Sequence, residues 1–260
     1  MLGVAALREK PSLQDQVELN QATGNYPDAL VCLQRMDPEE SDQHAADLVQ
    51  CYLNLGQPDT ASILAERLSR DKPETGGDLT GLQTEAAWQL GQWEELERRE
   101  ESTGWQSGLG RILLAIKRED WVTMRGKTDQ LRQEIVRSIT LTGALEHGAY
   151  QTSYRSVNQL GMLNELQLIA DKFLTCSTKQ LSSPSLASQE LLSELRTRLS
   201  FTQNFWPIQE PVLRLRRCVL ALAVDRVRPY SSSLAELLQY EVGQCWLQSA
   251  QLARRSGLLQ

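Results

Sequence analysis

Leu90-Gly91-Gln92-Trp93-Glu94-Glu95-Leu96 is the stretch that decides the fold of this chain, because two earlier stretches resemble it. They are Ala22-Thr23-Gly24-Asn25-Tyr26-Pro27-Asp28-Ala29-Leu30 and Leu55-Gly56-Gln57-Pro58-Asp59-Thr60-Ala61. Each places a glycine between two helix-favouring segments. The three glycines are 32 and 35 residues apart, which indicates an internal repeat of helix pairs.

The period is close to the roughly 34 residues of a tetratricopeptide unit, in which a small residue lies where two helices approach. The repeat therefore predicts helix contacts at its glycines and an aromatic filler at Trp88. A more degenerate fourth turn is predicted at Leu160-Gly161-Met162-Leu163. The candidate packing residues are Gly24, Gly56, Trp88, Gly91, Trp93, Gly161 and Trp246.

Helix signals are dense, and sustained strand-like alternation is lacking. Ser12-Leu13-Gln14-Asp15, Asp37-Pro38-Glu39-Glu40 and Ser233-Leu234-Ala235-Glu236 are typical of helix starts. Between residues 208 and 224 one helix face carries Ile208, Val212, Leu215, Val219 and Leu222. We predict an all-α fold, an α-solenoid of tetratricopeptide-like antiparallel helix pairs, because such pairs must cover each other's apolar faces.

Residues 1–260 are predicted to form one continuous helical-repeat segment. Loops are expected at Arg70–Thr80 and at the Ser/Thr-rich stretch Thr175–Ser188. The second loop could separate sub-stacks 1–174 and 186–260. The last helix is expected from about Ser233 to Ser256, with no partner helix after it, so we expect a piece of a longer chain.

The net charge of −6 over 260 residues argues against direct binding of nucleic acid, which favours a basic surface. No apolar run is long enough to span a membrane. The cysteines are scattered without a C-x-x-C pair, which predicts buried, reduced thiols in an intracellular protein. They are Cys32, Cys51, Cys176, Cys218 and Cys245.

The sequence predicts no catalytic, cofactor-binding or metal-binding residue. Gly126-Lys127-Thr128 lacks the earlier glycine and the strand of a phosphate loop, and Gly108-Leu109-Gly110 lacks the third glycine of a dinucleotide fingerprint. His44 and His147 have no second ligand at helical spacing, which favours a structural or surface role.

Three sets of residues have two interpretations each. An acidic run is either a binding patch or a solvated helix face, the latter being commoner: Glu94, Glu95, Glu97, Glu100 and Glu101. Five arginines could meet an acidic partner or form salt bridges within the stack: Arg214, Arg216, Arg217, Arg226 and Arg228. The tryptophans are most simply filler between helices: Trp88, Trp93, Trp105, Trp121, Trp206 and Trp246.

Four segments resemble, in order along nearly the whole chain, the FAT domain of the phosphatidylinositol 3-kinase-related protein kinases. They are Thr84–Trp93, Glu146–Tyr154, Glu210–Arg217 and Val242–Ala250, and the last is the most specific. The likeness is greatest to the checkpoint members of the family. It is poor in the loops at 37–45, 70–80 and 175–190.

This resemblance implies a non-catalytic scaffold that cradles a kinase domain and packs against neighbouring helical repeats. The intact parent would be a nuclear serine/threonine kinase acting on Ser/Thr-Gln sites under replication stress. It would bind ATP and Mg²⁺ in its kinase domain, form a homodimer and have an obligate partner subunit. No direct contact with nucleic acid or membrane is implied.

The alternative from the residues alone is a stand-alone tetratricopeptide-type adaptor that binds peptides in a concave groove. Such a groove would carry matched rows of Lys, Arg and Asn in successive repeats, and the sequence shows no such rows. A kinase domain encoded downstream would favour the scaffold, and a stop codon after Gln260 would favour the adaptor.

Overall fold

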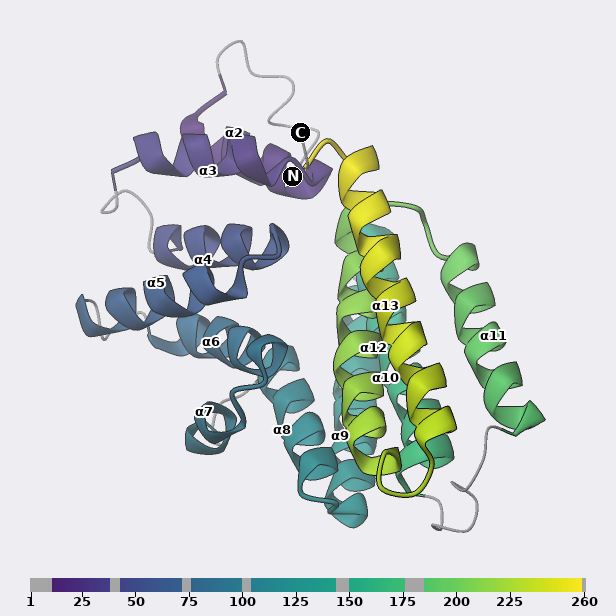
Figure 1. Ribbon diagram of the computed structural model, residues 1–260. Helices are drawn as coiled ribbons and strands as arrows, with labels where there is room; N and C mark the ends of the chain where they lie inside the picture. The colour runs from purple at the N-terminus through teal and green to yellow at the C-terminus, as the bar shows by residue number, and fades with distance from the viewer. Residues whose placement is uncertain are drawn as a thin grey trace. The chain divides into compact units, whose positions relative to one another are not determined.

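The computed structural model describes residues 11–37, 43–71, 76–99, 104–143, 150–175 and 185–258. Within these ranges the chain forms helices joined by turns, and no strand occurs (Figure 1). The all-α class and the α-solenoid of tetratricopeptide-like antiparallel helix pairs are thereby confirmed. None of the described helices is both long and apolar enough to cross a membrane.

The helices divide between two compact units, residues 1–110 with 253–260 and residues 111–252. Their bounds are α2 Leu13–Thr23, α3 Tyr26–Arg35, α4 His44–Asn54, α5 Pro58–Asp71, α6 Gly76–Leu90, α7 Trp93–Arg98, α8 Trp105–Lys117, α9 Trp121–Gly143, α10 Tyr150–Ile169, α11 Leu186–Phe201, α12 Trp206–Val227 and α13 Ser232–Arg255. A π-helical turn, η2, continues α10 over Ala170–Leu174.

In the first unit each helix packs on the next along the chain, from α2 through α7. The core at α4, α5 and α6 is made of aliphatic and small side chains, which lets the three helices approach closely. Its buried members are Val49, Leu53, Ala61, Ala65, Leu79, Leu82 and Ala86. This serial packing is the arrangement expected of a helical repeat.

In the second unit α10 packs against both α9 and α12. The apolar face predicted for residues 208–224 is the buried face of α12, where Val212, Leu215, Val219 and Leu222 are all buried. Arg214, Arg216 and Arg217 are also buried on this helix. Charged groups this deep require polar partners, because an unpaired charge away from water is energetically costly.

The three repeat glycines close one recurring turn. Gly24, Gly56 and Gly91 have φ of 77°, 73° and 68°, and each ends a helix that is followed two residues later by the next one. Around Gly91, its own N–H donates to Trp88 O (3.3 Å) and that of Gln92 to Ala87 O (2.9 Å). This is the Schellman motif, in which a left-handed residue satisfies the last carbonyls of the helix.

The prediction that the repeat glycines mark close helix contacts is wrong for Gly56 and Gly91. A Cβ at Gly91 would meet only Trp93 Nε1, at 3.8 Å, and a Cβ at Gly56 would meet nothing within 4 Å. The glycines are needed for their positive φ. The close approach lies at Gly110, where a Cβ would be 2.7 Å from Thr84 Cγ2.

A fourth turn of this type exists, but it does not contain Gly161. That glycine lies inside α10, so the turn predicted at 160–163 is wrong. The turn joins α8 to α9, where Glu119 has φ 58° and Asp120 N–H donates to Ala115 O (2.9 Å). The residue in the left-handed position here is a glutamate, so a search for glycines could not find it.

Helix starts and loops depart from the predictions in detail. The helix start predicted at Ser12–Asp15 is present as a capping box, in which each side chain accepts from the other residue's backbone N–H. The cap of α13 is Ser231, whose Oγ accepts from Leu234 N–H, and not Ser233. The loop predicted at 70–80 is shorter, since α6 begins at Gly76. Pro38–Glu40 and most of 175–188 lie outside the described residues, so the sub-stack boundary stays a prediction.

Candidate functional site

Both phosphate-loop-like patterns lie inside helices. Gly126-Lys127-Thr128 belongs to α9, where the Thr128 hydroxyl is buried and donates to Met124 O (2.8 Å). Gly108-Leu109-Gly110 belongs to α8. A phosphate-binding loop offers free backbone N–H groups, whereas the N–H groups within a helix are already bonded, so neither pattern can hold a phosphate.

The described ranges hold no group of three or more His, Cys, Asp or Glu side chains that could hold a metal ion. His44 is buried, and its Nε2 lies 2.9 Å from Leu33 O, which links α4 to α3. This is the structural role that the sequence favoured. His147 lies outside the described residues.

The most distinctive arrangement in the second unit is a set of buried ion pairs around α12. Arg216 donates from Nε to Glu165 Oε2 (2.6 Å) and from Nη2 to Oε1 (2.7 Å). Both side chains are less than one-tenth exposed. A two-pronged pair of this kind fixes both the distance and the orientation between α12 and α10.

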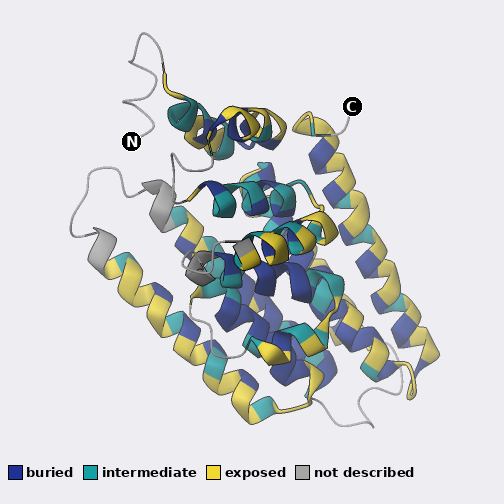
Figure 2. Ribbon diagram, turned by 90° about the vertical axis from the view of Figure 1, so that its left-hand side faces the viewer, coloured by how far each residue is buried: buried dark blue, intermediate teal, exposed yellow. Residues whose placement is uncertain are grey.

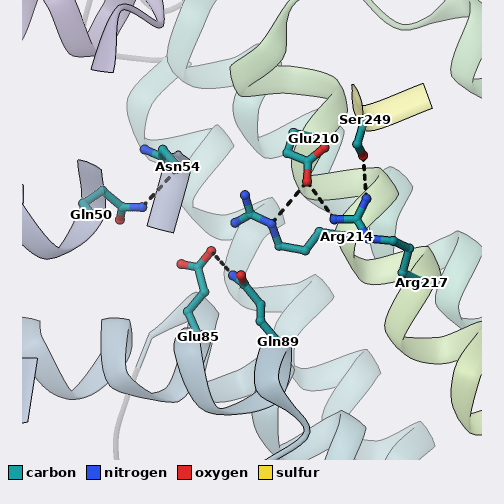
Figure 3. A network of polar contacts seen from close by, with 8 residues as sticks. All are labelled: Gln50, Asn54, Glu85, Gln89, Glu210, Arg214, Arg217 and Ser249. Carbon is teal, nitrogen blue, oxygen red and sulfur yellow. Dashed lines mark hydrogen bonds and ion pairs between the residues drawn. The ribbon is translucent and has the colours of Figure 1, made fainter. Parts of the chain in front are cut away.

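A second buried set links α12 to α13. Glu210 Oε1 accepts from Arg217 Nη2 (2.7 Å) and lies 3.6 Å from Arg214 Nε. Arg217 also donates from Nη1 to the Ser249 hydroxyl of α13 (Figure 3). The guanidinium of Arg217 is therefore held from two sides, and it ties the middle of α12 to the end of α13.

Four of the five arginines, Arg214, Arg216, Arg217 and Arg226, thus form salt bridges within the fold, whereas Arg228 is exposed. Besides the pairs above, Arg226 Nη1 lies 2.5 Å from Glu119 Oε1, and its guanidinium stacks over the Trp121 ring at 5.3 Å. Arg196 of α11 donates from Nε to Glu241 Oε2 of α13 (3.2 Å). Within the acidic run, Glu94 and Glu97 are exposed on α7 and Glu95 pairs with Arg98 at 2.6 Å, as expected of a solvated helix face, whereas Glu100 and Glu101 lie outside the described residues.

The thiol of Cys245 lies among these charges. Burial raises its pKa, and the nearby Arg216 and Arg217 guanidinium groups offset that rise only in part. Burial likewise raises the pKa of Cys51 to about 11. Thiolates are the reactive form of cysteine, so neither position has the character of a nucleophile.

The tryptophans do not share one role. Trp88 and Trp206 are buried, as filler between helices should be. Trp93, Trp105 and Trp121 are partly exposed. Trp246 differs from all of these, because it is 60 % exposed. The prediction that Trp246 fills space between helices is wrong.

Trp246 is exposed but positioned. The guanidinium carbon of Arg217 lies 4.0 Å from the centroid of its ring. The same arginine is bound by Glu210 and Ser249, so the cation under the ring is fixed. A desolvated cation below an aromatic face is an attractive contact. Sequence spacing could not reveal this, because the three partners are separated by up to 39 residues.

Polar contacts in the first unit include one between two helices and one within a helix. Glu85 of α6 is buried and accepts from Gln106 Nε2 of α8 (2.6 Å) and from Gln89 Nε2 (3.1 Å; Figure 3). The contacts of His44 with Leu33 O, of Arg216 with Glu165 and of Arg217 with Ser249 each join one helix to another. Together they are structural connections and contain no reactive constellation.

Comparison with known families gives a direct match. The model of the FAT domain matches residues 80–260. The chain belongs to the FAT domain family. The match includes α12 and α13, so the buried ion pairs and Trp246 lie within the FAT domain. The resemblance read from Val242–Ala250 and the other segments is confirmed.

Individual relatives of this FAT-domain chain are similar over almost its whole length. Serine/threonine-protein kinase ATR of Oryza sativa subsp. indica is 26% identical over 277 residues, which is 99% of this chain and 10% of the relative. ATR of Arabidopsis thaliana is 25% identical (98% and 10%), and ATR of Drosophila melanogaster 23% (91% and 9%). The chain spans about a tenth of the length of these relatives.

Proposed function

We propose that this chain is a non-catalytic scaffold segment of an ATR-like serine/threonine kinase. It cradles the kinase domain and supports the dimer contacts of the parent, which acts in the nucleus in the replication-stress checkpoint with an obligate partner subunit. ATP and Mg²⁺ bind to the parent's kinase domain. The observation that carries this proposal is the FAT family match over 80–260 together with relatives named ATR kinases.

The buried ion pairs give the scaffold its mechanical character. A helical repeat contacts only its neighbours, so its form depends on how each helix is set against the next. The Arg216–Glu165 pair fixes α12 against α10 by directional hydrogen bonds. The hydrogen bond from Arg217 to the Ser249 hydroxyl fixes α12 against α13, and Glu210 of α12 holds the same guanidinium in place. A kinase domain held by such a scaffold responds to a local packing change through its position or mobility, while its own residues stay intact.

The test compares the full-length parent with the isolated chain. The purified parent should phosphorylate a Ser-Gln peptide and leave a matched Ser-Ala peptide less modified. The isolated 1–260 chain should show neither phosphate transfer nor saturable binding of Mg-ATP by calorimetry. Micromolar ATP binding by the isolated chain, or a parent without kinase activity that captures peptides in a groove, would contradict the proposal.

A further inference from the structure

The helix α11 buries only one of its sides. Its buried residues recur at helical spacing, which places them on one face; they are Ser188, Leu191, Leu192, Leu195 and Leu199. Figure 1 shows α11 at the edge of the second unit, next to α13, and the two helices line a common cavity. In α12, by contrast, every residue from Val212 to Arg217 is buried, so that helix is surrounded on all sides.

Few polar contacts hold α11 to the other helices. In its middle, Arg196 donates from Nε to Glu241 Oε2 of α13 (3.2 Å). Near its end, the Leu199 carbonyl accepts from Gln209 Nε2 of α12 (3.2 Å). Within the described part of the chain, the side chains of Leu186–Leu195 make polar contacts only with their own helix and its cap. This longer part of α11 is therefore held to its neighbours by apolar burial alone.

The packing beneath α11 is incomplete. A cavity of about 10 Å³ lies between α11, α12 and α13, and its lining includes Leu195, Leu220 and Cys245. That is about the space that one water molecule occupies. Atoms on the two sides of such a gap lose dispersion contacts with each other. Burial of the leucines therefore stabilises this contact less than a close-packed interface would.

The ion pair between Arg196 and Glu241 is partly open to water. The Arg196 side chain is 51 % exposed, whereas that of Glu241 is 6 % exposed. Solvent and salt screen a pair of this kind, so it contributes less than a fully buried pair such as Arg216–Glu165. If α11 moves away, Glu241 loses its partner but gains water, so the movement leaves no buried charge unpaired.

The turn that follows α11 is held firmly. Gln209 Nε2 of α12 donates to the Thr202 carbonyl (3.3 Å) and to its Oγ1 (3.1 Å). The N–H of Gln203 donates to the Tyr154 hydroxyl of α10 (3.1 Å). The turn is therefore bound to two other helices, which makes it the fixed point about which α11 can move.

The position of α13 does not depend on α11. Figure 2 shows α13, the helix that runs to the C-terminus, with both buried and exposed residues along its length. Its link to α12 is the hydrogen bond from Arg217 to the Ser249 hydroxyl, which involves no residue of α11. The surface beneath α11 can therefore keep its form when α11 moves.

We propose that α11 is a strap that opens and closes as a unit about the turn at residues 202–205. The Arg196–Glu241 ion pair holds the strap closed. Opening exposes Glu241, Cys245 and the apolar surface around Leu220, while α10, α12 and α13 stay folded. Local opening of this kind requires less free energy than global unfolding, because it exposes only one helix face. The inference concerns this chain alone and does not depend on the proposed function.

Hydrogen exchange of the 1–260 chain, followed by mass spectrometry, tests the proposal. Relative to the unfolded chain, amides of residues 189–196 should exchange roughly tenfold faster than those of 212–217. Arg196→Gln should raise the rate in α11 several-fold further and leave α12 unchanged, whereas Arg196→Lys keeps the charge and should stay near the wild-type rate. Arg198→Ala, which removes the pair with Glu194 within α11, is the matched control and should have a smaller effect than Arg196→Gln.

Alkylation of Cys245 by iodoacetamide gives a second measurement, because this thiol lines the cavity under α11. In Arg196→Gln its rate should rise by about the same factor as the exchange of α11, while Cys51 of the first unit stays unmodified. Equal protection of α11 and α12 in the wild-type chain would overturn the inference, because the two helices would then open only together. Unchanged exchange in Arg196→Gln, or faster exchange in all helices alike, would also contradict it.

Discussion

Arg216 and Glu165 form a two-pronged ion pair, with N–O distances of 2.6 and 2.7 Å, although they are 51 positions apart in the sequence and both are buried. The pair joins α12 to α10 in the second unit. A buried charge that loses its partner cannot regain its hydration, so the pair holds the two helices in one relative setting.

Removing one member of this pair should therefore be costly. We expect Glu165→Gln and Arg216→Met each to lower the free energy of unfolding by about 3–5 kcal/mol. The double variant Glu165→Leu/Arg216→Met should recover much of the loss, because neither charge is then left alone. Urea denaturation measures all three. The control is Arg198→Ala in the exposed pair with Glu194, expected to cost about 0.3–0.5 kcal/mol.

Gly91 and Gly110 should respond differently to the same substitutions. Gly91→Ala is expected to cost about 1–2 kcal/mol because φ is 68°, with Gly91→Asn costing less. Gly110→Ala should cost about 1–3 kcal/mol by overpacking against Thr84, with the larger Asn costing more. Thermal melts of the four variants give the order. If Ala and Asn lower the melting temperature equally at both positions, Gly91 is not required for its positive φ and Gly110 is not required for lack of space.

Glu119 occupies a left-handed position that disfavours its own side chain. Replacing it by Gly removes strain of about 1–2 kcal/mol and also removes the ion pair with Arg226. The carboxylate is well exposed, so the ion pair contributes less than the strain. We expect Glu119→Gly to raise the melting temperature. Glu119→Gln, which keeps the strain and loses the charge, should lower it slightly.

Cys51 should be unreactive in the folded chain. Burial raises its pKa from the ordinary 9.0 to about 11, so the thiolate is scarce at pH 8. Iodoacetamide at pH 8 should modify Cys51 only after unfolding in urea, as followed by mass spectrometry. Because the unfolded thiol ionises first, its contribution to stability is complete below pH 9 and is lost as pH rises to about 11. Rapid modification of the native chain would contradict this burial.

Local features of this fold could be predicted from sequence. The spacing of Val212, Leu215, Val219 and Leu222 defines the buried face of α12, and the Ser12–Asp15 cap is a property of four adjacent residues. The glycine period located three turns because a Schellman turn ends at a left-handed residue, which is usually Gly. The fourth turn has Glu119 instead of Gly in the left-handed position, so the glycine pattern of the sequence could not reveal it.

Long-range features could not be predicted in the same manner. The pairing of Arg216 with Glu165 depends on how α12 and α10 are placed. From the sequence alone, many other acidic residues are equally possible partners of Arg216. Trp246 follows buried Cys245, and composition alone favours burial of an indole; only the rotation of α13 turns it outward over Arg217. A glycine is required at position 91 because of its positive φ and not because a neighbouring helix is close. Either requirement selects glycine, so the sequence alone cannot distinguish the two reasons.

The central claim is that this chain controls a kinase mechanically. The most direct measurement is the phosphorylation of Ser-Gln substrate by the full-length parent carrying Trp246→Ala, with folding checked by thermal melt. Trp246 is exposed, so the variant should fold. We predict an altered kcat for the peptide with an unchanged KM for ATP. A folded variant with wild-type basal and stimulated turnover would contradict the claim.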